Sequence, residues 1–358
     1  MSISWVDSLT FHANLTPSKV ALVGDGIVFS YSQLAAAIGV IEHRLREAKV
    51  RNGAFIAVQF DRSLEQLVAF AATYRMGLSF AAVPAGRIDW LADLGCDLIL
   101  TDKLLSYRVT GRIQSTPVLV LGDSWHRTEA AAETDPYPPR DSEIVALNSL
   151  DKWDQSNSAT VITRGDLDRR VMGLARLMAT ASTSNRVVTS VDLNSTTGLL
   201  LAMASFMLGR TLAATGKAQA REVIATYRHE FLVATASQLE DLANAQAAIP
   251  LPLNTLESGL VLLERGVSAD WVDRIQSLVC PNLHAAWSAP DFGPVTFQTA
   301  RRLTDATCLG YIPPWIEAMS DDAGKIAVRS AVGPENEGGW IGTGRRGRIN
   351  EDRLLFLD

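Results

Sequence analysis

The stretch that decides the fold is Ile144–Leu167, which reads IVALNSLDKWDQSNSATVITRGDL. It begins with the apolar run Ile144–Leu147, continues through a polar segment, and becomes apolar again at Val161–Thr163. Short apolar runs of this length are typical of buried strands, and Asp166 with Leu167 opens a segment with helical spacing. The stretch therefore predicts a strand, a polar loop and the start of a helix.

The same alternation of strands and helices extends along the chain in both directions. Before the stretch, apolar runs predict strands at Val20–Val23, Phe29–Tyr31, Phe55–Val58, Phe80–Val83, Asp97–Thr101 and Val118–Leu121. After it, a helical stripe and two further strands are predicted at Leu167–Met178, Val187–Val191 and Phe231–Ala234. Strands that alternate with helices in this way predict mainly parallel sheets with helices on both faces.

Three serines mark predicted helix starts. Ser32 precedes a stripe with helical spacing, and Ser268 precedes another. The segment Ser63–Gln66 has the form of a capping box, and Gly77 closes the helix that it opens.

Beyond about Pro290 the pattern changes to short β-like pieces separated by glycine and proline. This suits a small barrel or sheet. The predicted fold class is therefore α/β, with two stacked α/β subdomains at residues 1–165 and 166–290. A small β-rich subdomain, interpreted as a β-barrel, is expected at residues 291–358.

Composition excludes several function classes. The 358 residues are 47% hydrophobic and 20% charged, and the net charge of −6 gives no basic footprint for nucleic acid. The three cysteines have no metal or disulfide spacing, which fits a reduced cytoplasmic setting. The N-terminus lacks the features of a signal peptide, and the longest apolar run, Leu199–Leu208, is too short to span a membrane.

Several short motifs occur in a fixed order along the chain: Ala13–Pro17, Val20–Leu22, Phe29–Leu34, Gly53–Val58, Gly324–Arg329 and Gly339–Gly344. In this order they resemble the motifs of the adenylate-forming enzymes, which include acyl-CoA synthetases, luciferases and the adenylation domains of peptide synthetases. The resemblance implies the fold of that family's large N-terminal domain, with ATP and Mg²⁺ used for carboxylate adenylation. It also places the family's hinge near Asp358, so we expect the C-terminal lid domain and its lysine to be absent.

The resemblance places the family's phosphate-binding loop, of the form YTSGTTGxPKG, at Ser149–Ala159. Glycines let backbone N–H groups converge on a phosphate, and this segment contains none. Lys152 and Gln155 stand at glycine positions, and Ser158 stands at the lysine position. We interpret the segment as a degenerate phosphate loop made of Asp151, Lys152, Trp153, Asp154, Gln155 and Ser158.

At the family's other nucleotide-binding positions, this sequence keeps some of the expected residue types and changes others. The resemblance places Trp287 against the adenine and Asp291 at the Mg²⁺ position, and it places Thr343 and Gly344 in the motif that holds the ribose. In the family an aspartate follows that pair and accepts hydrogen bonds from the ribose hydroxyls. Here Arg345 takes its place, and a guanidinium is a donor only.

Plainer interpretations compete with each of these. A buried structural role is the main alternative for Trp287. The segment Gly342–Gly347 matches G-x-G-x-x-G, but a β-turn is the better interpretation because too few residues follow for a dinucleotide fold. The arginines at 345, 346 and 348 are interpreted as an anion site, as a solvated face, or as partners of Glu351 and Asp352. The sequence predicts neither a metal site nor a catalytic residue.

Three hypotheses about function follow. The first is a ligase-like protein without ATP-driven ligation, which binds an acyl or carboxylate ligand, a carrier protein or an intact adenylating enzyme. Removal of one preorganised charge-stabilising group costs about 10²–10³ in rate, so several such losses would leave adenylation negligible. The second is an active AMP-forming ligase completed by a separate lid domain, and the third is a structural subunit of a biosynthetic complex. ATP, AMP and Mg²⁺ are expected as ligands only if a residual site survives.

Overall fold

The computed structural model describes residues 4–83, 88–113, 115–122, 125, 144–146, 161–216, 219–289, 292–302, 306–330 and 339–358. The chain forms two compact units. The first comprises Met1–Val171 and Asp192–Thr211, and the second comprises Met172–Val191 and Leu212–Asp358. The three-part division expected from the sequence stays a prediction.

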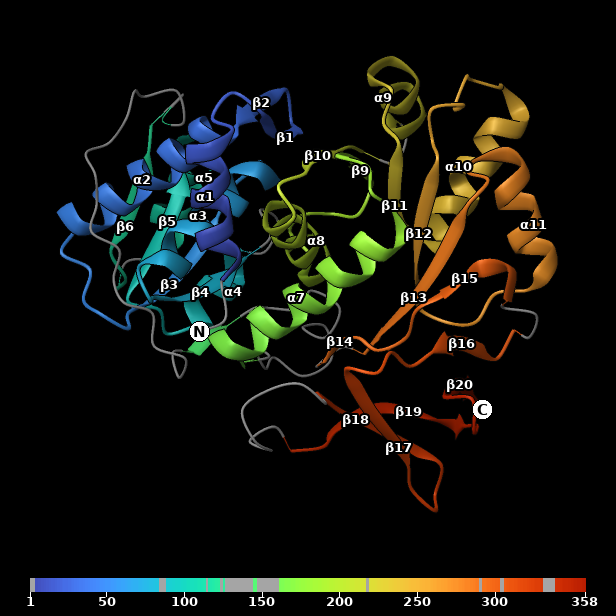
Figure 1. The fold of residues 1–358 in the computed structure, drawn as a ribbon. Coiled ribbons are helices and arrows are strands. Elements are labelled where there is room, and N and C mark those ends of the chain that lie inside the picture. Colours follow the sequence, from blue (N-terminus) through green and yellow to red (C-terminus); the bar gives the residue numbers. More distant parts are fainter. Residues whose placement is uncertain are drawn as a thin grey trace. The chain divides into compact units, whose positions relative to one another are not determined.

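Strands and helices alternate through the first unit (Figure 1). In chain order its elements are α1 (Trp5–Leu15), β1 (Val20–Gly24), β2 (Ile27–Ser30), α2 (Tyr31–Glu47), β3 (Phe55–Gln59), α3 (Ser63–Arg75), β4 (Ser79–Ala82), α4 (Ile88–Asp93), β5 (Leu98–Asp102), α5 (Lys103–Arg112), β6 (Val118–Leu121), β7 (Ile144–Ala146), β8 (Val161–Thr163) and α8 (Thr196–Met207). Helix α7 (Arg164–Ala181) begins in this unit and ends in the second.

A four-stranded sheet organises the first unit. Its order is β4-β3-β5-β6, and its three strand pairs are parallel, as the sequence predicts. Ala57 of β3 and Ile99 of β5 lie in one buried apolar cluster with Leu91 of α4 and Val109 of α5. Full burial of an aliphatic side chain contributes about 1.5–3 kcal/mol, so this cluster is a major source of the unit's stability.

Two of the predicted helix starts are wrong. Helix α2 is capped by Ser30, whose Oγ accepts a hydrogen bond from the Gln33 amide at 3.2 Å, and not by Ser32. Ser63 does not cap α3 but lies inside it. The start of α3 is instead held by Asp25, in the turn between β1 and β2, whose carboxylate accepts from Ser63 Oγ at 3.1 Å and from the Leu64 amide at 3.3 Å.

The second unit contains the following elements after its part of α7: β9 (Arg186–Thr189), β10 (Thr211–Ala214), α9 (Ala220–Tyr227), β11 (Phe231–Thr235), α10 (Ala236–Ala248), β12 (Ser258–Leu263), α11 (Ala269–Leu278), β13 (Leu283–Ala289), β14 (Gly293–Pro294), β15 (Gln298–Thr299), η3 (Ala300–Arg302), β16 (Cys308–Tyr311), β17 (Ile316–Ser320), β18 (Lys325–Ser330), β19 (Ile341–Ile349) and β20 (Leu354–Leu357). Thr211, the first residue of β10, belongs to the first unit.

A mainly parallel sheet again forms the centre of this unit. Its strands follow the order β14-β13-β12-β11-β9-β10, and the pairs β9–β11, β11–β12 and β12–β13 are parallel. Helix α10 packs on β11 and β12 and against α11 (Figure 1). The predicted cap of α11 is confirmed, because Ser268 Oγ accepts from the Trp271 amide at 3.2 Å.

The predicted β-rich part is present as a five-stranded antiparallel sheet. Its order is β16-β20-β19-β18-β17, so that β16 and β17 are its edge strands. The segment Gly342–Gly347 lies within β19, so the prediction of a β-turn there is wrong. Among the described residues 348–358, the element that follows is strand β20 and not the helix that a dinucleotide fold requires.

Candidate functional site

The parallel sheet of the second unit has its topological switch point between β9 and β11. Strand β10 lies on one side of β9, and β11 to β13 follow on the other. In open α/β sheets, ligands bind outside the carboxyl ends of the strands at such a point. Here Thr189 Oγ1 donates to the Val233 carbonyl at 2.7 Å, and Gln238 Nε2 donates to the Ser190 carbonyl at 2.8 Å. These bonds fix the backbone at the edge of the sheet where a ligand is expected.

Trp287 lies near the carboxyl end of β13. Its amide donates to Thr296 Oγ1 at 3.1 Å, and its carbonyl accepts from the Val295 amide at 2.8 Å. The residue is only 2% exposed. Because stacking on a base needs an accessible ring face, Trp287 can serve as an adenine platform only if neighbouring side chains move. Asp291, the candidate Mg²⁺ ligand, lies outside the described residues.

Thr343, Gly344 and Arg345 form a bulge in β19. Thr343 Oγ1 donates to the Ile326 carbonyl at 3.0 Å and accepts from the Arg345 amide at 3.2 Å. Gly344 has a φ of +69°, a left-handed conformation that favours glycine, and the pairing of β18 with β19 shifts register here. The motif therefore has a defined backbone geometry, and the buried Thr343 hydroxyl is already used by the fold.

The three arginines of β19 have different surroundings. Arg346 Nη2 donates to the Ala323 carbonyl at 2.7 Å, and the Arg348 guanidinium lies 4.9 Å from the centre of the Phe356 ring. Arg345 is exposed, and its guanidinium has no partner among the residues that the structure describes. None of the three pairs with Glu351 or Asp352, so that expectation is wrong.

The strand and the helix predicted at the two ends of Ile144–Leu167 are confirmed as β7 and α7, and the polar loop stays a prediction. Strands β7 and β8 pair antiparallel, with Ala146 opposite Val161, so the two ends of the intervening segment lie close together. Helix α7 follows β8 directly. The degenerate loop residues Asp151, Lys152, Trp153, Asp154, Gln155 and Ser158 lie outside the described part of the chain.

Comparison with known proteins shows a family match over part of the chain and a shared fold over all of it. The model of the family described as AMP-binding enzyme matches residues 9–160. Surfactin synthase subunit 2 of Bacillus subtilis (strain 168) is 28% identical over 144 residues, which are 38% of this chain and 4% of that protein. The N-terminal domain of FACL13 from Mycobacterium tuberculosis superposes with a TM-score of 0.80 at 15% identity and covers 100% of both chains. Coronafacic acid ligase from Pectobacterium brasiliense gives a TM-score of 0.79 at 15% identity, over 99% of this chain and 77% of that one.

Residues 9–160 are similar to the AMP-binding enzyme family, and the whole chain shares the fold of the N-terminal domain of FACL13. The family match covers the first part of the chain, and the structural likeness extends the fold over the rest. Because the chain spans only 4% of its synthase relative, that protein's activity and partners do not transfer directly.

A buried clamp, which the sequence analysis missed, fixes the start of α7 in this adenylate-forming fold. Arg164 is 4% exposed, lies 3.7 Å from the centre of the Tyr74 ring, and donates to the Tyr74 carbonyl at 2.7 Å. The Tyr74 hydroxyl donates to Asp168 at 2.6 Å. Tyr74 lies 90 residues before Arg164, so no local pattern links it to α7 and only the fold reveals the clamp. It anchors the chain directly after the segment assigned to the phosphate loop.

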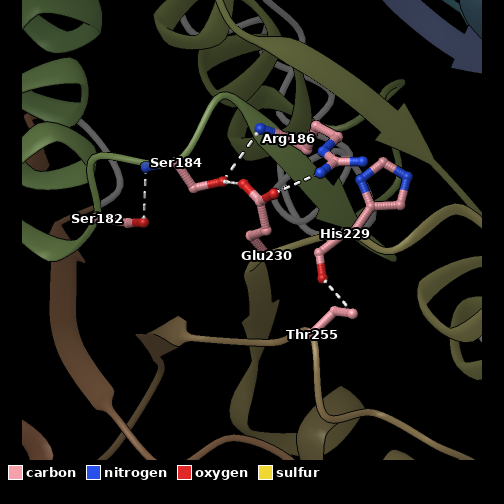
Figure 2. Close-up of polar contacts among 6 residues, drawn as sticks. All are labelled: Ser182, Ser184, Arg186, His229, Glu230 and Thr255. Carbon is pink, nitrogen blue, oxygen red and sulfur yellow. Dashed lines mark hydrogen bonds and ion pairs between the residues drawn. The ribbon is translucent and has the colours of Figure 1, made fainter.

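A second polar network lies at the opposite, amino-terminal ends of β9 and β11 (Figure 2). The Glu230 carboxylate accepts from Ser184 Oγ and from Arg186 Nη2, both at 2.6 Å. The Ser184 hydrogen bond, assisted by Arg186, lowers the pKa of Glu230. Burial lowers the pKa of the neighbouring His229 to about 4, so this imidazole is neutral near pH 7. The network lies away from the carboxyl ends of the strands, and we assign it a structural role.

The described residues contain neither a metal-type cluster of side chains nor a helix that could span a membrane. No group of three or more His, Cys, Asp or Glu residues there is placed to hold a metal ion. No helix in the described part of the chain has the length and apolar character needed to cross a membrane.

Proposed function

We propose that this protein binds an acyl or carboxylate ligand without performing ATP-driven ligation. The observation that carries the proposal is Arg345, which stands where the family has its ribose-binding aspartate. Its guanidinium is exposed and unpartnered in the part of the chain that the structure describes. A guanidinium cannot accept the hydrogen bonds that ribose hydroxyls donate, so the site has lost its ribose acceptor.

The sequence of the phosphate loop supports the same proposal. The segment 149–159 has no glycine to bring backbone amides together, and Ser158 replaces the lysine that would contact phosphate. Loss of one charge-stabilising group costs about 10²–10³ in rate. Two such changes at the nucleotide, even without full additivity, would leave adenylation negligible.

We propose that the protein acts in the cytoplasm with a carrier protein or an intact adenylating enzyme as partner. The relative in Bacillus subtilis is named as one subunit of a synthase, which supports a role beside other synthetase components. Three free, buried cysteines in the described chain are compatible with a reducing compartment.

The test is acid-dependent pyrophosphate exchange, combined with thermal shifts for a panel of fatty, aromatic and amino acids. We expect no exchange with any acid, and at least one acid that stabilises the protein in the absence of ATP. Exchange above background with any acid would overturn the proposal. If no acid in the panel stabilises the protein, the ligand-binding part of the proposal is overturned.

An active AMP-forming ligase is the second candidate. It is favoured by the likeness to coronafacic acid ligase, whose name describes a ligase, over 99% of this chain. Positive exchange would support this candidate. Arg345→Asp would then be expected to increase the exchange rate, because it restores an acceptor for the ribose hydroxyls.

A further inference from the structure

Helix α5 presents an unusual outer face. Its inner face is fixed by Leu105, Val109 and Ile113, which are buried at a spacing of four residues. Among the outer residues, Tyr107 is 86% exposed and Leu104 is 68% exposed. Two large apolar side chains one turn apart on a single helix are an exposed apolar surface without a role in the core of the unit.

Positive charge surrounds these apolar side chains. Residues 103–122, which cover α5 and continue through β6, contain Lys103, Arg108 and Arg112 but no Asp or Glu. Both arginines are exposed, and neither has a hydrogen bond or ion pair among the described residues. On other helices of the described chain, the exposed Arg44 is paired with Glu47 and the exposed Arg169 is paired with Asp166. The α5 face therefore combines an exposed tyrosine and leucine with two unneutralised guanidinium groups.

We propose that the outer face of α5, defined by Leu104, Tyr107, Arg108 and Arg112, is a docking surface for an acidic helix of another protein. Arg108 and Arg112 are four residues apart, so carboxylates one helical turn apart on a partner match their spacing. Tyrosine and arginine are the side chains that most often dominate binding energy at interfaces. The two arginines require a partner surface with negative charge, and Tyr107 and Leu104 supply the apolar contact.

The alternative occupants fit the charges less well. The whole chain carries a net charge of −6, so two copies repel one another at long range and a second copy is disfavoured. An anionic membrane would accept the same arginines, but α5 has only ten residues and two large apolar side chains with which to insert. The proposal does not depend on the proposed function, because α5 carries none of the residues that the resemblance assigns to the nucleotide.

The test uses the full chain and a fluorescent helical peptide of roughly 18 residues, long enough to hold a helix, with glutamates and leucines on one face. We expect saturable binding that weakens as salt is raised, because the attraction is electrostatic. Arg108→Glu/Arg112→Glu is expected to weaken binding by about tenfold or more, and Tyr107→Ala by a similar factor. The matched control Lys49→Glu/Arg265→Glu makes the same change in net charge at exposed residues outside α5 and is expected to bind as the unmodified protein does.

Three results would overturn this proposal. One is absence of peptide binding at low salt, or equal weakening in the control variant. Another is preferential binding to vesicles with anionic lipids, which would indicate a membrane surface. A third is a concentration-dependent dimer, seen by sedimentation, that the Arg108→Glu/Arg112→Glu variant abolishes. Circular dichroism and the unfolding midpoint of each variant show whether it is folded before binding is compared.

Discussion

At the scale of single residues, the burial of His229 makes stability depend on pH. Its pKa is lowered to about 4 in the fold, mainly by burial, against 6.5 for the free side chain. The neutral form is therefore favoured by folding. This contribution is complete above pH 6.5 and is lost as the pH falls towards 4, by about 2–3 kcal/mol.

The measurement for His229 is urea unfolding at pH 7.5, 5.5 and 4.5. His229→Gln keeps a neutral polar side chain, so its stability should fall less over this range than that of the unmodified protein. His43→Gln is the matched control, because His43 is exposed on α2. Parallel curves for the unmodified protein and His229→Gln would contradict the assignment of a buried neutral imidazole.

The buried Glu65 is expected to make stability depend on pH in the opposite direction. Burial raises its pKa to about 7 from 4.5, with Arg62 opposing and nearby carboxylates adding to the shift. The protonated form is favoured by folding, so stability is present below pH 4.5 and is lost as the pH rises through 7. Glu65→Gln should therefore be more stable than the unmodified protein at pH 8, by about 1–2 kcal/mol after allowance for solvent screening.

Urea unfolding at pH 5 and pH 8 tests the Glu65 prediction. The gain from Glu65→Gln should be present at pH 8 and largely absent at pH 5. Glu257→Gln, at an exposed position, should give no such difference. A loss of stability at pH 8 would show that the charged carboxylate is needed by the fold.

At the scale of elements, the start of α3 depends on a residue far away in sequence. Asp25 has a φ of +50° and caps α3 from the turn between β1 and β2. Asp25→Ala removes the acceptor and puts alanine in a left-handed conformation, so we expect a loss of about 1–3 kcal/mol. Asp25→Asn keeps an acceptor and tolerates that conformation, and it should lose much less. Equal losses in chemical unfolding would contradict the capping role.

Helices and strands with a regular pattern of apolar residues were predictable from the sequence. Helices in which apolar and polar residues occur on the same face were not. The flanks of Ile144–Leu167 and the parallel order of the sheets follow from apolar runs and alternation. Helix α5 was missed because exposed Leu104 and Tyr107 obscure its inner stripe. Helix α10 was missed because alanine and a buried glutamine, Gln246, replace larger apolar residues on its inner face.

The candidate site was predictable in part, and for a physical reason. Local motifs single out Thr343 and Gly344 as candidate residues, but the bulge that they form in β19, with Gly344 at a left-handed φ, was not predicted. Burial of Trp287 and the Arg164 clamp depend on contacts between distant segments, which no local pattern encodes. The same holds for Asp25, which is 39 residues from the amide that it caps.

At the scale of the whole molecule, the fold favours a ligase, whereas the residues at the expected nucleotide positions favour a protein without ATP-driven ligation. The fold is that of the adenylate-forming N-terminal domain, whose structural relatives include a ligase. The positions that the resemblance assigns to ATP differ from the family motifs in sequence, with Arg345 in place of an aspartate and no glycine in 149–159. A protein that keeps the scaffold and loses the nucleotide contacts is expected to bind its acyl ligand in a way that does not depend on ATP.

The most direct test of this account is calorimetric titration of the purified chain with ATP, with and without Mg²⁺. Binding is measured rather than turnover, because it reports on the nucleotide site itself. The account predicts no saturable heat and no thermal stabilisation at millimolar ATP. Saturable binding in the micromolar range would contradict it, and would show that a nucleotide site survives without the glycine-rich loop and with Arg345 at the ribose position.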